Sequence, residues 1–103
     1  MENLYKIIIA EDEPIICKDI AEKVMQMGLP LKVCALAENG GEALEAIKTY
    51  APHILITDIK MPEMNGLELI RRVRKEFPDN IILKEPGQVL IVCSPYAYKR
   101  RTY

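Results

Sequence analysis

Two short apolar runs that each end in acidic residues place the strongest constraint on the fold of this 103-residue chain. Residues 5–10 are followed at once by Glu11 and Asp12, and residues 54–57 are followed by Asp58. A short run rich in β-branched residues is typical of a parallel strand that is buried on both faces. If the two strands are neighbours, their acidic residues meet at the carboxyl edge of the sheet, where α/β proteins bind ligands.

Carboxylates gathered at one edge of a sheet need a positive counter-charge. Glu11, Asp12 and Asp58 would repel one another in a shared crevice, and a hard divalent cation with oxygen ligands would hold them together. The sequence therefore predicts a metal site at this edge, and Mg²⁺ is the expected ion.

Helical patterns alternate with the strands. Apolar residues recur at helical spacing in residues 14–27, 43–51 and 67–77. The three predicted strands that alternate with them are residues 5–10, 31–37 and 53–57. The order β-α-β-α-β-α is the signature of an α/β fold with a doubly wound, mainly parallel sheet and helices on both faces.

Each predicted helix has an apolar stripe that should face the sheet. The expected buried residues are Ile16, Ile20, Val24 and Met27 in the first helix, Ala43, Leu44, Ile47 and Ala51 in the second, and Leu67, Ile70, Val73 and Phe77 in the third.

Composition excludes several classes of partner and compartment. The formal net charge of −1 gives no argument for nucleic acid or an acidic membrane surface. No apolar run approaches the roughly 20 residues that span a bilayer, and the N-terminus lacks the features of a signal peptide. Cys17 and Cys34 lie among apolar residues, so we interpret them as reduced core thiols of a cytoplasmic protein. A chain of this length is expected to form a single domain.

With these elements in this order, the chain resembles the receiver domains of bacterial two-component response regulators, the family related to the chemotaxis protein CheY. The matching stretches are residues 7–14, 37–44 and 56–67. The resemblance covers about three quarters of the chain, from residue 5 to about 78. It implies a flavodoxin-like receiver fold with strand order 2-1-3-4. The expected organisation is one receiver-like domain over residues 1–103, which is regular over residues 5–78 and atypical over residues 79–103.

The resemblance also implies a chemistry for the acidic residues. Asp58 would accept a phosphoryl group, Asp12 would bind Mg²⁺ directly, and Glu11 would support the metal. The backbone carbonyl of Lys60 would be a further metal ligand, and Asp58 itself would also contact the ion. The donor would be the phosphohistidine of a sensor histidine kinase or a small acyl phosphate. No enzyme activity is expected beyond this self-catalysed transfer and dephosphorylation.

The same residues have plainer explanations. Asp58 could satisfy backbone N–H groups after a strand, and Glu13 could complement the helix dipole. His53 is interpreted as a strand-edge residue. As rival functions, the chain could be a degenerate receiver that acts only as a protein-interaction module or, more remotely, a metal-dependent phosphohydrolase.

The C-terminal part departs from the family, and two arrangements remain open. In the preferred one, residues 89–93 form the fourth strand and Ser94 supplies the hydroxyl that contacts the phosphoryl group. In the other, residues 81–83 form the fourth strand, residues 89–93 return antiparallel as an edge strand, and Lys84 replaces the lysine that receivers carry near the acidic site.

The shortened C-terminal part has two further consequences. The usual last strand and helix are expected to be missing, which would leave an apolar surface uncovered and favour a homodimer. No DNA-binding domain follows residue 103, so no direct contact with nucleic acid is expected, and none with a membrane.

Overall fold

Three β–α units form the regular part of the molecule. The computed structural model describes residues 4–76, 81–84 and 89–93, with side chains described as far as residue 76. The elements are β1 (Tyr5–Ala10), α1 (Pro14–Met25), β2 (Leu31–Ala37), α2 (Gly40–Tyr50), β3 (Ile54–Asp58), α3 (Gly66–Glu76), β4 (Ile81–Lys84) and β5 (Val89–Cys93). The strands and helices through α3 follow the order predicted from the sequence.

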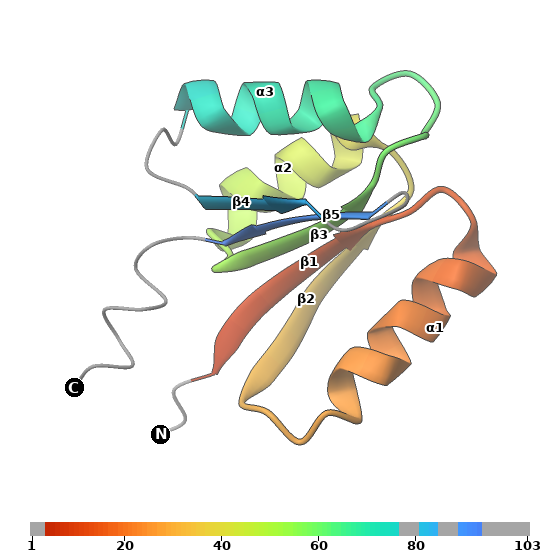
Figure 1. Ribbon diagram of the computed structural model, residues 1–103, viewed down its shortest axis with the longest axis vertical. Helices are drawn as coiled ribbons and strands as arrows, with labels where there is room; N and C mark the ends of the chain where they lie inside the picture. Colours follow the sequence, from red (N-terminus) through yellow and green to blue (C-terminus); the bar gives the residue numbers. More distant parts are fainter. Residues whose placement is uncertain (1–3, 77–80, 85–88, 94–103) are drawn as a thin grey trace.

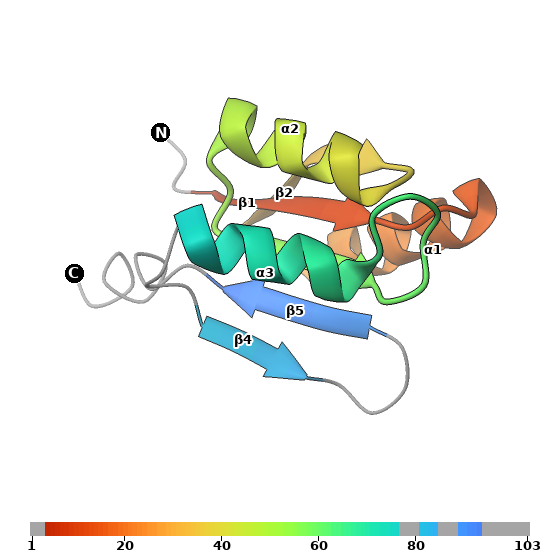
Figure 2. The ribbon, with the colours of Figure 1, turned by 90° about the horizontal axis from the view of Figure 1, so that it is seen from above.

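The strands make one five-stranded sheet in the order β2-β1-β3-β5-β4. β1 lies at the centre of its parallel part and pairs with both β2 and β3. Helices α2 and α3 cover one face of the sheet and α1 covers the other (Figures 1 and 2). The predicted α/β class, the doubly wound arrangement and the strand order 2-1-3 are therefore confirmed.

The pairing of the last two strands differs from both predicted arrangements. β5 lies beside β3, as the preferred arrangement required, but it runs antiparallel, with Val89 opposite Asp58 and Cys93 opposite Ile54. The hairpin of the second arrangement is present, but β4 forms the sheet edge instead of β5. β5 pairs along all five residues of β3, and β4 pairs with β5 along four.

Apolar side chains form a separate cluster on each face of the sheet. The larger cluster joins α2 and α3 to the sheet and contains the buried residues Ile8, Ala10, Ala37, Ala43, Leu44, Ile47, Leu55, Met61, Leu69, Ile70 and Val73. The smaller cluster joins α1 to the sheet through Ile7, Ile9, Cys17 and Val24. Half-buried apolar residues, among them Ile20, Ile54 and Ile56, complete this second cluster.

The predicted helical stripes are only partly correct. In α1, Val24 is buried and Ile20 half-buried, but Ile16 is 41% exposed and Met27 lies beyond the helix end. Cys17 is buried where Ile16 was expected, because the buried side of α1 is rotated by about one residue from the side that carries the predicted aliphatic stripe.

The other two helices need smaller corrections. In α2, Ala43, Leu44 and Ile47 are buried as predicted, whereas Ala51 is the C-cap. In α3, Ile70 and Val73 are buried as predicted, whereas Leu67 is 52% exposed and Leu69 is buried instead. Phe77 lies outside the described residues. Among the described helices, none is long and apolar enough to cross a membrane.

Candidate functional site

The three predicted acidic residues meet at the carboxyl edge of the parallel strands. Glu11 and Asp12 directly follow β1, and Asp58 is the last residue of β3. Ala10 pairs with Thr57, so the two strands end side by side. One carboxylate oxygen from each acidic residue lies within 4.8 Å of the others. The structure thus brings together the cluster predicted from sequence.

The three carboxylates differ in burial and hydrogen bonding. Glu11 is only 5% exposed, and its Oε2 accepts a hydrogen bond from the Glu13 backbone N–H at 3.1 Å. Oδ1 of Asp58 accepts from the Ile59 backbone N–H at 2.8 Å. The Glu13 side chain is exposed and makes no cap hydrogen bond at the start of α1.

The electrostatics of the cluster favour a bound cation. Burial, aided by the neighbouring Asp12 and Asp58 and opposed by the hydrogen bond from the Glu13 N–H, raises the pKa of the Glu11 carboxyl to about 7. A carboxyl in this position holds a proton near neutral pH unless another positive charge replaces it. Three clustered carboxylate oxygens are the donors that hard divalent cations prefer, so the residues present fit Mg²⁺.

The loop between β3 and α3 is held close to Asp58. The Gly66 N–H donates to the Ile59 carbonyl at 2.8 Å, and a Cβ on Gly66 would collide with the Asp58 carbonyl oxygen. Only glycine therefore fits at the start of α3. Lys60, whose carbonyl is the predicted metal ligand, lies in this loop and its side chain is exposed. Met61 anchors the loop in the larger apolar cluster.

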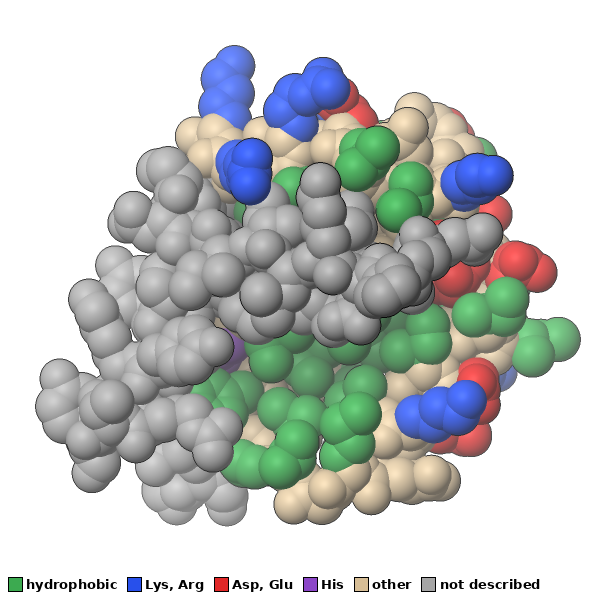
Figure 3. Space-filling view, in the orientation of Figure 1, with side chains coloured by type: hydrophobic (Ala, Val, Ile, Leu, Met, Phe, Trp, Pro, Cys, Tyr) green, Lys and Arg blue, Asp and Glu red, His purple; other side chains and the backbone are tan. Residues whose placement is uncertain are grey.

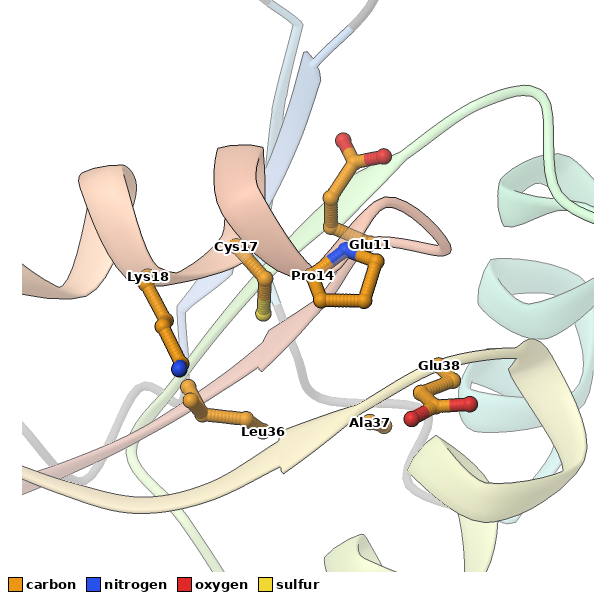
Figure 4. Close-up of a pocket in the computed structure, with 7 residues that line it drawn as sticks. All are labelled: Glu11, Pro14, Cys17, Lys18, Leu36, Ala37 and Glu38. Carbon is orange, nitrogen blue, oxygen red and sulfur yellow. The ribbon is translucent and has the colours of Figure 1, made fainter.

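An open pocket of about 160 Å³ lies next to the acidic cluster, between the first turns of α1 and the end of β2 (Figure 4). It is lined by Glu11, Pro14, Cys17, Lys18, Leu36, Ala37 and Glu38. Sequence reasoning missed it, because no local pattern shows that α1 and β2 leave a gap there. Burial, aided by the carboxylates of Glu11 and Glu38, raises the pKa of the Cys17 thiol, so this cysteine stays protonated and is no nucleophile.

The two C-terminal candidates fare differently from the acidic residues. Ser94 lies outside the described residues. Its predicted role required residues 89–93 to run parallel to β3, but β5 runs antiparallel. Cys93 therefore pairs with Ile54, at the opposite end of β3 from Asp58. The Lys84 backbone pairs with Leu90, which pairs in turn with Thr57. Lys84 is therefore two strands away from β3, at the level of the acidic edge.

His53 lies at the opposite edge of the sheet, as predicted. It is buried, and its ring Nδ1 accepts a hydrogen bond from the Lys6 backbone N–H at 2.9 Å. The backbone N–H of His53 donates to the Lys6 carbonyl at 2.9 Å. Its ring packs edge-to-face on Tyr5, with centroids 5.3 Å apart. These contacts give His53 a structural role where β1 and β3 begin.

Known proteins share both the sequence and the fold of this chain. A transcriptional regulatory protein of Bacillus subtilis, YesN, is 45% identical over 75 residues, which are 73% of this chain and 20% of that protein. The receiver domain of AraT from Geobacillus stearothermophilus is 37% identical and superposes with a TM-score of 0.67, over 73% of this chain and 58% of that one. The receiver domain of NarL from Mycobacterium tuberculosis is 26% identical with a TM-score of 0.68, over 74% and 60% of the two chains.

The curated relatives are much longer than this chain, which covers 20–29% of the first two. The structural likeness confirms the flavodoxin-like receiver fold over the three parallel strands and three helices. The model of the response regulator receiver domain matches residues 7–85, more than half of the chain. The chain therefore belongs to the family of response regulator receiver domains, the phosphoacceptor modules of two-component signalling.

Proposed function

We propose that Asp58 of this receiver domain accepts a phosphoryl group in a Mg²⁺-dependent reaction, with a sensor histidine kinase as the physiological donor. The observation that carries the proposal is the meeting of Glu11, Asp12 and Asp58 within 4.8 Å at the end of two parallel strands. Asp58 ends β3 at this edge and lies within residues 7–85, which match the family model.

The chain's own groups prepare the Asp58 carboxylate for attack. Because the Ile59 N–H holds Oδ1, the other oxygen, Oδ2, is the one that we assign to the new bond with phosphorus. The bond between phosphorus and the donor's nitrogen or oxygen then breaks. Mg²⁺ held by Asp12, Glu11, Asp58 and the Lys60 carbonyl would neutralise the charge of the transferring group, on which phosphoryl transfer depends.

Intact-mass measurement after incubation with acetyl phosphate tests the proposal. We expect a phosphoryl adduct that needs Mg²⁺ and that is absent from Asp58→Asn. Asp12→Ala should weaken Mg²⁺ binding strongly, whereas the matched control Glu13→Ala should have little effect because the Glu13 side chain is exposed. An adduct that persists in Asp58→Asn, or that ignores chelation, would refute the assignment of Asp58.

A second proposal is that two copies of the chain associate through the α1 face. Ile16 is 41% exposed beside half-buried Ile20, and Figure 3 shows apolar side chains gathered on this side of the molecule. Asp19 and Lys23, an exposed ion pair with Nζ and Oδ2 3.0 Å apart, place one charge of each sign on the same helix. A two-fold dimer would cover the same surface in both copies.

Sedimentation at micromolar concentration tests the association. Ile16→Glu should shift the protein to a monomer, whereas Ile15→Glu, on the same helix but at an 83% exposed position, should leave the assembly intact. A stable wild-type monomer would refute the proposal and with it the interaction-module alternative in this form.

We also propose that the domain acts in the cytoplasm. The Cys17 and Cys34 thiols are both free, as expected of a protein in a reducing compartment.

A further inference from the structure

We propose that Gly40, the first residue of α2, is a positioning residue for the metal site. It acts on the loop of residues 59–65 through Met64, and the loop carries the Lys60 carbonyl. The inference rests on the proposed Mg²⁺-dependent function and extends it to a helix that supplies none of the acidic residues.

The start of α2 touches the loop directly. The Gly40 N–H donates to the Met64 carbonyl at 3.2 Å. A Cβ on Gly40 would lie 2.5 Å from that carbonyl oxygen and 2.7 Å from the Met64 Cβ, distances that real contacts do not show. The backbone fixes the positions of both the carbonyl oxygen and the Cβ of Met64, so a change of side-chain rotamer cannot relieve the collision. Any side chain at position 40 must push either the helix or the loop.

The helix is the better fixed of the two. Oδ1 of Asn39 accepts from the Glu42 N–H at 2.8 Å, and the Glu42 carboxylate accepts in return from the Glu38 N–H at 2.9 Å. The first bond caps the helix, and the second ties its first turn to the residue before the N-cap, so together they hold the start of α2 to the preceding chain. One turn later, Ala43 and Leu44 are buried in the larger apolar cluster. The loop is therefore expected to give way.

The loop has little freedom to absorb a push at Met64. Its start is tied by the Ile59–Gly66 hydrogen bond, and Met61 is buried. Pro62 has a fixed φ, and Glu63 already has a φ of 68°, which is unfavourable for a residue with a side chain. Displacement of Met64 must then rotate the remaining peptide groups, and these include the carbonyl of Lys60.

The metal itself supplies a specific readout. Mg²⁺ demands near-ideal octahedral geometry with short bonds, whereas Ca²⁺ accepts variable numbers and positions of oxygen ligands. A misplaced carbonyl should therefore weaken Mg²⁺ binding more than Ca²⁺ binding. Loss of a carboxylate, as in Asp12→Ala, should weaken both.

The experiment compares Gly40→Ala with Gly41→Ala by calorimetric titration with each metal alone. Both changes add one methyl group to the first turn of α2, but a Cβ on Gly41 would meet only Asn39 Oδ1, at 3.2 Å. We expect Gly40→Ala to lower Mg²⁺ affinity about 10-fold or more, as disturbed supports of metal ligands do, with a smaller loss for Ca²⁺. Gly41→Ala should keep the wild-type Mg²⁺ to Ca²⁺ affinity ratio.

A measurement on the wild-type protein covers the case in which Gly40→Ala fails to fold. Coupling between two sites is reciprocal, so Mg²⁺ should slow hydrogen exchange of the Gly40 amide more than that of the Gly41 amide. An unchanged affinity ratio in a folded Gly40→Ala, or an equal response of the two amides, would overturn the positioning role alone. If the wild-type protein binds no Mg²⁺, the proposed function fails and this inference fails with it.

Discussion

The two faces of the sheet differ in how many described apolar side chains are buried against them. Among the residues whose side chains the structure describes, eleven are buried in one cluster on the side of α2 and α3, whereas on the α1 side four are buried and six apolar residues are half-buried. The α1 side instead borders the pocket where the buried carboxyl of Glu11 and the thiol of Cys17 lie. Through residue 76, one face thus provides most of the apolar burial, and the other borders a pocket lined by the carboxyl groups of Glu11 and Glu38.

Removal of a large side chain from each face should show the greatest effect. Leu69→Ala, in the fully buried part of α3, is expected to lower the free energy of unfolding by about 2–5 kcal/mol, because it loses burial and leaves a cavity. Ile20→Ala, at a half-buried position of α1, should cost less than about 2 kcal/mol. Urea denaturation measures both. Equal losses would show that the α1 face is as well packed as the other.

A pH series tests the chemical character of the α1 face. The Glu11 carboxyl binds its proton more tightly in the folded protein, with a pKa of about 7, than at its ordinary value of 4.5. Its contribution to stability is therefore complete below pH 4.5 and is lost as pH rises through 7, up to about 3 kcal/mol in all. Urea denaturation of the metal-free protein at pH 5 and pH 8 measures this loss, and Glu11→Gln should remove it.

Mg²⁺ should oppose the same pH effect. Because the cation and the proton compete for Glu11, Mg²⁺ affinity should rise with pH through this range. A Glu11→Gln variant with the wild-type pH dependence would place the titrating group elsewhere.

The N-terminal ends of α2 and α1 also differ, and a smaller effect on stability is expected there. Asn39 caps α2 through the Glu42 N–H, whereas Glu13, at the start of α1, makes no side-chain cap hydrogen bond. Asn39→Ala should destabilise the protein by about 1 kcal/mol, and Glu13→Ala should be nearly neutral. Thermal or urea unfolding of the two variants measures the difference. A larger loss for Glu13→Ala would mean that this residue holds the acidic edge in place.

The smallest effect is expected at the far end of α2. Ala51 has a φ of 47°, in the left-handed region that favours glycine at a helix C-terminus. Ala51→Gly should raise the free energy of unfolding by about 0.5–1 kcal/mol. Ala46→Gly, inside the same helix, should lower it by about 1 kcal/mol. A loss in both variants would mean that the side chain of Ala51 contributes packing that outweighs its strain.

The acidic cluster was predictable because it depends on local patterns. Apolar runs that end in acid mark the ends of β1 and β3, and the parallel pairing of these strands follows from the intervening helices. Which of β4 and β5 lies beside β3 was not predictable in the same way. Val89–Cys93 is apolar throughout and β4 is apolar up to Lys84, so neither has the alternation that fixes register and facing. The short connection of residues 85–88 does require an antiparallel hairpin, since a parallel crossover needs a dozen residues or more.

Contacts between distant elements were beyond the sequence patterns. The collision that keeps Gly40 a glycine involves Met64, and the pocket beside Glu11 exists only where α1 and β2 come together. The error in the α1 stripe has a simpler origin. The large aliphatic side chains were counted as the buried line, although a cysteine at position 17 packs as a small apolar residue.

The antiparallel course of β5 has a practical consequence for handling the protein. Cys93 ends β5 opposite Ile54, and Ile54 pairs with Ile7 near the start of β1. The chain therefore enters the sheet at β1 and leaves it at β5 on the same edge, away from Glu11, Asp12 and Asp58. A dye or surface tether attached at residue 5 or residue 93 would begin from that edge, so labelling there need not obstruct the carboxylates.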